Sequence, residues 1–482
     1  MGEKFRFLLQ LPPDVPVGIS GAYWSSLASD FGAAGLRPVP QEATPSQPLK
    51  AAFVQTGGWN GKGIGQAASR LAGSAGMVVL VRRNHLPAQW SRARAIRAAA
   101  RNGLALEAEF IPVPTIDQAE AFLTPGLDRG EWQLGHSRIP LAALRGPRDR
   151  LLFLRTGGGH TGFAEAGRLL EAATGDAGFA IERFHLRRRG ALVMVLRHQN
   201  GSGRVIRIAT NPRVAALARW NQEITRDLRG QAALAAQARE LIPEPLGAAA
   251  NGTVEGFAES FHSGRLAWLL YRDAEIRSRI DRGLFQFSHA LQSATCRQTR
   301  LERDALAGLL DRYLGAVEKR LGSRPGLGER LGSIRARLAR LLGGREFPLC
   351  AAHGDYGVGN AIATPEGTLT AIIDWDQFQP ADPAGVDWCD YRIKADHFRR
   401  SIFDALPAMI AEATRYGRLA PPHSGFGGGD FGLTQPDLAT IPCLAVLREM
   451  ARSAGFPGEL AQSESHYKSL LDLVGSHLPE PA

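Results

Sequence analysis

The sequence predicts an N-terminal α/β domain followed by a two-lobed α+β fold. Short apolar segments alternate with helical segments over residues 50–114, which is typical of a parallel sheet with crossover helices. The apolar period changes to two over residues 179–209, where two glycine-containing turns join three segments. Residues 265–342 have a predominantly helical pattern. A small antiparallel sheet that precedes a helical region predicts one small lobe and one large lobe.

Length and composition restrict the class of protein. The chain has 482 residues, enough for two to four domains at about 100–200 residues each. An apolar fraction of 44% and a charged fraction of 22% exclude a disordered chain and a coiled coil. No apolar run reaches the roughly 18 residues that span a membrane, and residues 7–9 are too short for a signal peptide, so we expect a cytoplasmic protein. The cysteines lack metal-ligand spacing and are expected to be reduced and structural: Cys296, Cys350, Cys389 and Cys443.

The N-terminal α/β prediction depends on the order of its segments. Strands and helices alternate at 51–55, 66–71, 77–81, 89–101 and 110–114. The segments resemble, loosely, the second half of an S-adenosylmethionine-dependent methyltransferase, which implies a partial Rossmann-like domain over residues 1–145. About 50 residues precede the first strand, too few for a complete nucleotide-binding half, and no acidic residue ends a preceding strand to bind a ribose.

A glycine-rich loop leaves a second interpretation of this domain open. Residues 61–65, Gly-Lys-Gly-Ile-Gly, lie between a predicted strand and a predicted helix, the context in which backbone N–H groups bind phosphate. Lys62 does not have the spacing of a Walker motif. We therefore expect a degenerate, structural domain, with cofactor binding as the alternative.

The small lobe is predicted over residues 146–260, with a linker and a helix at its start. Three strands are expected at 179–186, 191–196 and 204–209, followed by a helix over 213–229. In that helix Leu217, Trp220 and Ile224 are spaced by three and four residues, so they share one face. The large, mainly helical lobe is predicted over residues 261–482.

The motif that indicates a function lies in the large lobe. It reads His353-Gly354-Asp355, with Asn360 five positions after the aspartate, and Ile-Asp-Trp follows with Asp374 at its centre. This pattern resembles that of the aminoglycoside phosphotransferase and choline kinase family over residues 179–396. The resemblance implies a protein-kinase-like fold and phosphoryl transfer from ATP, or GTP, to a hydroxyl group of a small molecule.

The resemblance also implies a role for each motif residue. Asp355 would orient the acceptor hydroxyl and accept its proton, while Asn360 and Asp374 would bind Mg²⁺ beside the nucleotide phosphates. Taken one at a time, an aspartate in a glycine-rich loop is usually a turn residue, and the asparagine a cap. The conjunction at fixed offsets has a chance probability on the order of 10⁻³, which favours the functional interpretation.

Three further residues are expected to support the catalytic loop. The segment Gln379-Pro380-Ala381-Asp382-Pro383-Ala384-Gly385-Val386-Asp387 is similar to one that follows the motif in this family. The resemblance implies that Asp382 and Asp387 brace the loop. His353 is expected to be structural, with a general-base role as the alternative.

The small lobe departs from the family pattern at one position. Its third strand normally carries a lysine that binds the α- and β-phosphates, but the chain has no lysine between Lys62 and Lys319. Arg207 occupies the matching place, and Glu223 in the following helix is the expected partner. Arginine keeps the charge but has a larger and differently placed donor group. A plain ion pair without a nucleotide role is the alternative, and it would suggest a pseudokinase that serves as a nucleotide-binding or interaction module.

The nucleotide base has an expected binding segment as well. Residues 257–261 resemble the linker between lobes in this family, which places adenine against the backbone of Glu259, Ser260 and Phe261. Arg187, Arg188 and Arg189 lie in the turn between the first two strands and could cover the phosphates, although such a run is more often a solvated surface.

The distribution of charge along the chain indicates which kinds of molecule the protein could bind. Residues 1–350 have a net charge of +18 and residues 351–482 a net charge of −8. The acidic third favours a cationic acceptor, such as an amino sugar or amino alcohol. The basic part raises the possibility of nucleic-acid binding, but its arginines are dispersed and are not interleaved with aromatic residues, so we expect no nucleic-acid partner.

Overall fold

The computed structural model divides the chain into two compact units. The first comprises Met1–Glu223 with Glu244–Phe261, and the second Ile224–Pro243 with His262–Ala482. The structure describes all residues except 1, 13, 41–47, 58–61, 83–87, 114–120, 124–130, 135–136, 141–149, 157–161, 186–189, 253, 325, 398–400, 420–430, 455–463 and 481–482. The three arginines of the turn at 187–189 and the boundary expected near 145 therefore lie outside the described residues.

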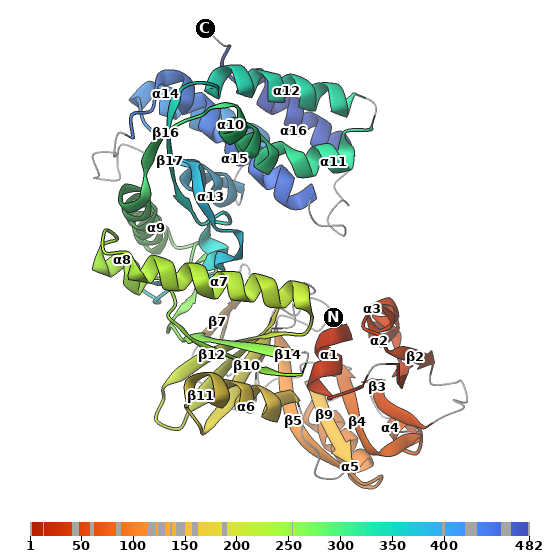
Figure 1. Ribbon diagram of the computed structural model, residues 1–482. Helices are drawn as coiled ribbons and strands as arrows, with labels where there is room; N and C mark the ends of the chain where they lie inside the picture. The colour runs from red at the N-terminus through yellow and green to blue at the C-terminus, as the bar shows by residue number, and fades with distance from the viewer. Residues whose placement is uncertain are drawn as a thin grey trace. The chain divides into compact units, whose positions relative to one another are not determined.

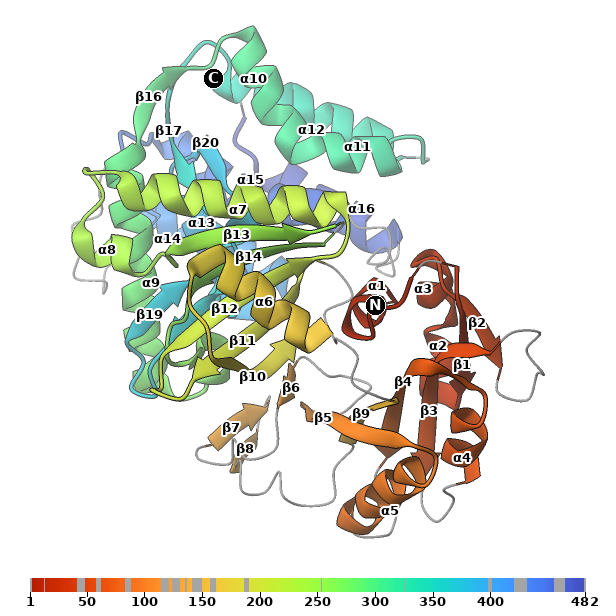
Figure 2. The ribbon, with the colours of Figure 1, turned by 60° about the horizontal axis from the view of Figure 1, so that its bottom comes forward.

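A twelve-stranded sheet forms the centre of the first unit (Figure 2). Its strand order is β13-β14-β12-β11-β10-β6-β5-β9-β4-β3-β1-β2. The strands from the N-terminal part are β1 (Pro16–Ser20), β2 (Arg37–Pro40), β3 (Leu49–Gly57), β4 (Leu71–Arg82), β5 (Leu104–Val113), β6 (Ala121–Leu123) and β9 (Arg150–Thr156). The separate strands β7 (Glu131–Leu134) and β8 (Ser137–Pro140) pair with each other.

The predicted alternation of strands and helices is confirmed for the N-terminal segment. Strand β3 pairs with β4 in parallel, and α4 (Lys62–Ala68) connects them. The helix α5 (Ala88–Ala100) then leads to β5, but β9 lies between β4 and β5 and runs antiparallel to both. Residues before the first predicted strand add α1 (Gly2–Leu8), α2 (Ala22–Ser26) and α3 (Ala28–Ala33) as well as two strands. These short elements were not expected from the sequence, because their apolar runs are brief and carry no clear period.

The predicted three-stranded meander is also confirmed. Strands β10 (Phe179–His185), β11 (Leu192–His198) and β12 (Gly203–Ala209) pair antiparallel in chain order. Strand β12 then pairs with β14 (Val254–Ser260), which pairs with β13 (Pro245–Asn251).

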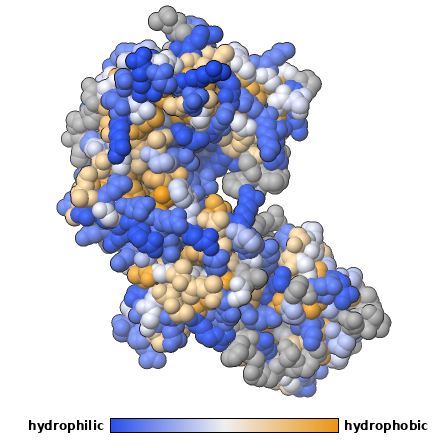
Figure 3. Space-filling view, viewed as in Figure 1, coloured by the Kyte–Doolittle hydropathy of each residue, from blue (hydrophilic) through white to orange (hydrophobic). Residues whose placement is uncertain are grey.

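Two helices cover the faces of this part of the sheet. On one face, Ile206, Ile208 and Ala258 share a buried cluster with Leu169 of α6 (Gly162–Thr174). On the other face, buried residues of β12 and β14 pack against α7 (Pro212–Gly230): Ala209 and Phe257 contact Ala215 and Ala218. The period of two in the sequence thus separates two faces that are both buried. Most exposed residues of α7 are polar, although Trp220 is 38% exposed (Figure 3).

Helices make up most of the second unit (Figure 1). They share one large apolar core in which Leu314, Leu338 and Leu444 are fully buried. The helices are α8 (Ala236–Glu240), α9 (Ala274–Thr295), α10 (Arg303–Leu310), α11 (Ala316–Leu321), α12 (Leu327–Leu342), α13 (Val386–His397), α14 (Ile402–Tyr416), α15 (Gln435–Ala454) and α16 (Glu464–His477). All four cysteines are free thiols, as expected.

Two small sheets in the second unit position the motif. In one, β17 (Glu346–Ala352) lies between β16 (Arg297–Arg300) and β20 (Gln379–Pro383). In the other, β18 (Ala361–Ala363) lies between β15 (Arg265–Leu266) and β19 (Leu369–Ile372). The catalytic loop therefore starts at the end of a buried central strand and continues into a hairpin. None of the helices in the described ranges is long and apolar enough to cross a membrane.

Candidate active site

The catalytic loop begins where β17 ends. A glycine is required at position 354, because its φ is +84° and an added Cβ would lie 1.9 Å from the Gln377 carbonyl oxygen. The carboxylate of Asp387, on the first turn of α13, accepts the backbone N–H groups of His353 at 2.5 Å and of Gly354 at 3.2 Å. Asp387 thus anchors the start of the loop through two backbone hydrogen bonds.

His353 joins the loop to the following hairpin. Its side chain is fully buried; Nδ1 accepts the Asp355 N–H at 3.3 Å, and Nε2 lies 2.9 Å from the Ile373 carbonyl oxygen. The proton therefore resides on Nε2, which donates to Ile373. Burial lowers the pKa of His353, although Asp387 and Asp355 partly oppose this effect. A neutral ring with both nitrogens engaged fits the expected structural role.

Two cations and one amide contact the carboxylate of Asp355. Lys394 Nζ lies 2.7 Å from Oδ1, and Arg452 donates to the same oxygen. Asn360 Nδ2 donates to Oδ2 at 3.0 Å and to the Asp355 carbonyl at 2.9 Å. Burial alone would raise the pKa of Asp355, but Lys394 and then Arg452 outweigh it and hold that pKa well below its usual value. The carboxylate is therefore ionised and fixed in orientation.

The structure brings Asn360 and Asp374 to neighbouring positions. Asn360 ends a short 3₁₀ turn, η5 (Val358–Asn360), and its carbonyl accepts the N–H of Ile373 at 2.8 Å. Asp374 follows directly, with φ +72° and ψ +58°, a left-handed conformation that is uncommon for residues other than glycine and often found at functional sites.

The donor set at this point fits a hard divalent cation. Because Nδ2 of Asn360 is tied to Asp355, the amide is oriented and its Oδ1 has no bond to a described residue. With the Asp374 carboxylate on the adjoining strand end, the site offers only oxygen ligands, as Mg²⁺ and Ca²⁺ prefer. Among the described residues, no group of three or more His, Cys, Asp or Glu side chains is placed to hold a metal ion.

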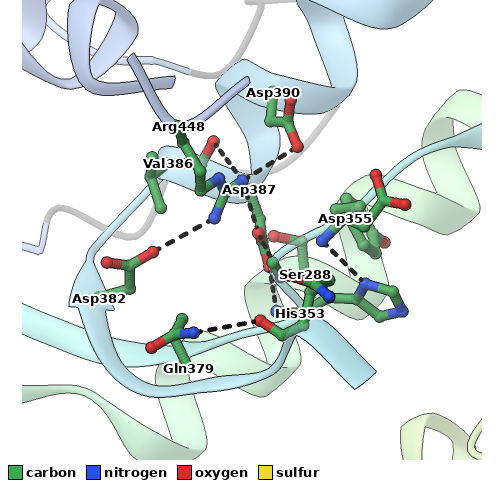
Figure 4. Close-up of polar contacts among 12 residues, drawn as sticks. Ser288, His353, Asp355, Gln379, Asp382, Val386, Asp387, Asp390 and Arg448 are labelled. Carbon is green, nitrogen blue, oxygen red and sulfur yellow. Dashed lines mark hydrogen bonds and ion pairs between the residues drawn. The ribbon is translucent and has the colours of Figure 1, made fainter. Parts of the chain in front are cut away.

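A buried ionic network of side chains from β20, α13 and α15 supports the loop (Figure 4). Arg448 of α15 contacts three carboxylates: Asp382 at 3.2 Å, Asp387 at 2.9 Å and Asp390 at 3.2 Å. Asp382 also accepts the Tyr313 hydroxyl at 2.9 Å. Both predicted bracing aspartates thus lie in one network, and its arginine holds them in place.

The predicted partner of Arg207 is wrong. Its Nε lies 3.2 Å from each carboxylate oxygen of Glu259, which is buried, whereas Glu223 is exposed on α7. The neighbouring Gln222 points inward instead and donates to the Gly247 and Ala258 carbonyls at 2.9 and 3.0 Å. One position along a helix turns the side chain by about 100°. Sequence spacing alone could not resolve that rotation.

The expected adenine-binding segment is the end of β14. Ser260 donates its N–H to the Glu244 carbonyl at 2.9 Å, and its hydroxyl accepts the Glu244 N–H at 2.9 Å. The ring of Phe261 lies under the guanidinium of Arg197, with the Cζ 3.9 Å from the ring centroid. Both side chains thus have structural contacts, and their roles toward a nucleotide stay a prediction.

Three cations at the site were not expected from the sequence. Lys394 is on α13, while Arg448 and Arg452 are on α15, which begins 80 residues after Asp355. One signal was present: Asp390 and Lys394 are four positions apart and form an ion pair at 2.8 Å. For the two arginines, only tertiary packing brings α15 to the loop.

The motif, its bracing aspartates and the small antiparallel sheet occupy one continuous region of the chain. Residues 187–385 match the model of the phosphotransferase enzyme family, designated APH. This part of the chain is similar to that family. The match contains Arg207, Asp355, Asn360 and Asp374, so the kinase-like fold and the enzyme class predicted from the motif are confirmed. A search of curated proteins finds no match to the chain.

Solved structures similar to the chain include aminoglycoside phosphotransferases and an ethanolamine kinase. An aminoglycoside phosphotransferase of Ralstonia eutropha, so described provisionally, is 14% identical, with a TM-score of 0.43, over 65% of this chain and 97% of that one. APH(3'')-Id of Streptomyces rimosus, in complex with ADP and streptomycin, is 17% identical, with a TM-score of 0.37, over 59% and 96%. The ethanolamine kinase of Plasmodium vivax is 11% identical, with a TM-score of 0.37, over 61% and 80%.

Proposed function

We propose that the protein transfers the γ-phosphoryl group of ATP or GTP to a hydroxyl group of a small molecule. The observation that carries this proposal is the ionised carboxylate of Asp355, which is held in one orientation just after β17. Asn360 donates a hydrogen bond to that carboxylate, and its carbonyl accepts the N–H of Ile373, the residue before Asp374. A carboxylate five residues before an asparagine, with a second aspartate in the next hairpin, is the arrangement that phosphotransferases of this fold use. The family match supports the same reaction.

Asp355 acts on the acceptor hydroxyl. Its carboxylate accepts the hydroxyl hydrogen and aims the oxygen at the γ-phosphorus. The acceptor oxygen forms the new P–O bond, the bond to the β,γ-bridging oxygen breaks, and the proton passes to Asp355, which leaves ADP and a phosphate ester. A carboxylate with a low pKa is a weak base, so most of its effect comes from orientation, which suits a loose transition state.

Asn360 and Asp374 would hold a divalent cation, which we propose to be Mg²⁺. The ion, when bound, neutralises charge on the nucleotide phosphates. The protein's own contribution is the orientation of its ligands: Asp355 fixes the Asn360 amide, and the Ile373–Asn360 backbone bond keeps Asp374 beside it. Small-lobe residues would bind the nucleotide, with Arg207 toward the phosphates and Glu259, Ser260 and Phe261 near the base.

Nucleotide binding tests the proposal without knowledge of the acceptor. A ligand at about 100 times its Kd stabilises the folded state by about 2.7 kcal/mol, a clear shift in melting temperature. We expect ATP or GTP to stabilise the protein only with Mg²⁺, Asp374→Asn to remove the effect, and Asp355→Asn to keep it while it abolishes transfer. Asp304→Asn, at an exposed position of α10, is the control. Stabilisation without transfer to any hydroxyl compound would indicate the pseudokinase.

The N-terminal α/β segment has a structural role in this proposal. In parallel sheets, ligands bind beyond the carboxyl ends of the strands, where the strand order reverses, and here that place lies between β1 and β3. Near that edge the Gln55 side chain accepts the Tyr23 N–H at 3.0 Å, and a Cβ at Gly21 would lie 2.4 Å from Gln55. A stabilising effect of S-adenosylmethionine on the purified protein would contradict the structural role.

Two observations suggest opposite charges for the acceptor. The net charge of −8 over residues 351–482 favours a cationic acceptor such as an amino sugar. The charged groups in direct contact with Asp355, however, are Lys394 and Arg452. Electrostatic attraction weakens with distance and is screened by salt. The charged side chains that contact Asp355 therefore influence the binding of an acceptor more than the net charge of residues 351–482 does.

A further inference from the structure

Two of the four free cysteines lie opposite each other on neighbouring segments. Strand β16 pairs antiparallel with β17, and the register of this pair, continued by one position before β16 begins, places Cys296 opposite Cys350. The next position in the same register is joined as well, because the Ala351 N–H donates to Thr295 Oγ1 at 3.0 Å. Cys296 has an extended backbone, with φ −65° and ψ 135° directly after α9. The alignment of the two segments therefore extends through both cysteines.

The separation that follows from this register suits a disulfide. Residues directly opposite each other in an antiparallel pair have Cα atoms about 4.5–5.5 Å apart and side chains on the same face. Disulfides join cysteines whose Cα atoms are about 4.4–6.8 Å apart. The sulfur atoms of Cys296 and Cys350 can therefore bond without a change in how β16 pairs with β17.

The two thiols differ in access and in acidity. Cys350 is 1% exposed, whereas Cys296 is only half-buried. A hydrogen bond between the two thiols lowers the pKa of Cys296 and raises the pKa of Cys350, and burial raises the pKa of Cys350 further. The thiolate is the form of cysteine that attacks oxidants. Cys296 thus combines access with thiolate character, as oxidant-sensitive cysteines do, and Cys350 lies where a resolving cysteine is needed.

We propose that Cys296 and Cys350 form a site of reversible oxidation, at which hydrogen peroxide oxidises Cys296 and Cys350 then closes a disulfide. In the first step the Cys296 thiolate attacks one peroxide oxygen and the O–O bond breaks, which gives a sulfenic acid and, once protonated, water. In the second step the Cys350 sulfur attacks the sulfenic sulfur. The S–S bond forms, the S–O bond breaks, and the hydroxyl group leaves with the Cys350 proton as water. The two thiols lose two electrons, which the peroxide accepts.

The site lies next to the catalytic loop in the chain. Cys350 is on β17, which ends at Ala352, directly before His353. On the other side of this strand, Cys350 pairs with Asp382 of β20. The disulfide would join the end of α9 to the strand that leads into the loop. Oxidation of this pair does not require the phosphotransferase function, so a failure of either proposal leaves the other standing.

The other two cysteines provide an internal control. Cys389 of α13 and Cys443 of α15 are both 0% exposed. Burial raises the pKa of both thiols, that of Cys389 to about 12. Neither cysteine combines access to solvent with thiolate character. We therefore expect both to stay reduced in the folded protein under conditions that oxidise Cys296.

Peptide mapping of the full-length protein after treatment with hydrogen peroxide tests the proposal. Free thiols are alkylated in denaturant before digestion with trypsin and with a protease that cleaves after glutamate. The second protease is needed because Cys350 and Cys389 share one tryptic peptide, which Glu366 divides. We expect a peptide pair linked through Cys296 and Cys350, which dithiothreitol separates, and full alkylation of Cys389 and Cys443.

Two variants test the order of the steps. Cys296→Ser should abolish the oxidation of Cys350. In Cys350→Ser the sulfenic acid has no partner, so dimedone, which reacts with sulfenic acids, should label Cys296. Cys443→Ala is the control and should form the same link as the unmodified protein. Circular dichroism checks that each variant folds, and mapping of the unmodified protein decides the matter if Cys350→Ser does not.

Four outcomes would overturn the proposal. The first is no linked peptide in peroxide-treated protein, and the second is a link found only in a covalent dimer on a non-reducing gel. The third is equal oxidation of Cys389 and Cys443, because opening of the fold would then determine the reaction. The fourth is oxidation of Cys350 in Cys296→Ser to the same extent as in the unmodified protein.

Discussion

His353 accepts the backbone N–H of Asp355 through Nδ1, at 3.3 Å. Because Nε2 of the same ring donates to the Ile373 carbonyl at 2.9 Å, the imidazole links the catalytic loop to the strand end that carries Asp374. A ring that is engaged on both sides and fully buried fits the structural role expected for His353. The histidine of the motif thus joins Asp355 to the strand end that carries Asp374.

His353→Gln should change how stability depends on pH. The pKa of His353 is lowered, mainly by burial, so the folded state binds its proton less readily than the unfolded state, where the pKa is about 6.5. The stabilisation from the neutral ring is therefore full above that value and is lost as the pH falls below it. Between pH 8 and pH 5.5, the free energy of unfolding in urea should fall more for the unmodified protein than for His353→Gln. His477→Gln, on the last turn of α16, is the control. Parallel pH dependences would contradict the expectation.

Asp387→Asn should destabilise the protein and lower kcat. The variant loses the ion pair with Arg448 at 2.9 Å and one of the two acceptors for the loop N–H groups. Removal of one partner from a buried ion pair typically costs about 3–5 kcal/mol. Urea unfolding measures the stability, and transfer kinetics should show a lower kcat with little change in the KM for ATP. Asp304→Asn should change neither quantity.

Glu259→Gln and Glu223→Gln distinguish the two candidate partners of Arg207. Glu259 is 7% exposed and contacts Arg207 at 3.2 Å, so its neutralisation should cost about 1.5–3 kcal/mol. Glu223 is exposed, so its change should stay within about 0.5 kcal/mol. Thermal or urea unfolding of the two variants decides the matter: a larger loss for Glu223→Gln would restore the pairing expected from the sequence.

Gly354→Ala should disrupt the catalytic loop, whereas Gly359→Ala should not. At Gly354 the positive φ and a Cβ position 1.9 Å from the Gln377 carbonyl require the backbone to move. At Gly359, five positions on, nothing lies within 4 Å of an added Cβ. We expect Gly354→Ala to lose activity and stability, and Gly359→Ala to keep its stability to within about 1 kcal/mol. Comparable unfolding free energies of the two variants would show that the loop adapts.

Local patterns were sufficient to predict the strands of the meander and the spacing within the motif. The period of two over residues 179–209 predicted β10, β11 and β12, and the fixed offsets between Asp355, Asn360 and Asp374 predicted residues that the fold does bring to neighbouring positions. These predictions succeed because hairpins and short loops connect residues close in sequence. The central position of β9 was not predicted, since its pairing with β4 and β5 joins segments far apart along the chain.

The sequence by itself determined the similarity to a phosphotransferase family, the strands of the meander and the offsets between Asp355, Asn360 and Asp374, because each depends on spacing within a few tens of residues. The tertiary structure decided which charges meet. The packing of α15 against α13 brings Arg448 and Arg452 to the loop, and the rotation of α7 turns Glu223 outward and leaves Arg207 with Glu259. Charges act through space, over a few ångströms, so the partner of a side chain follows from how helices and strands pack and is not encoded in any local segment.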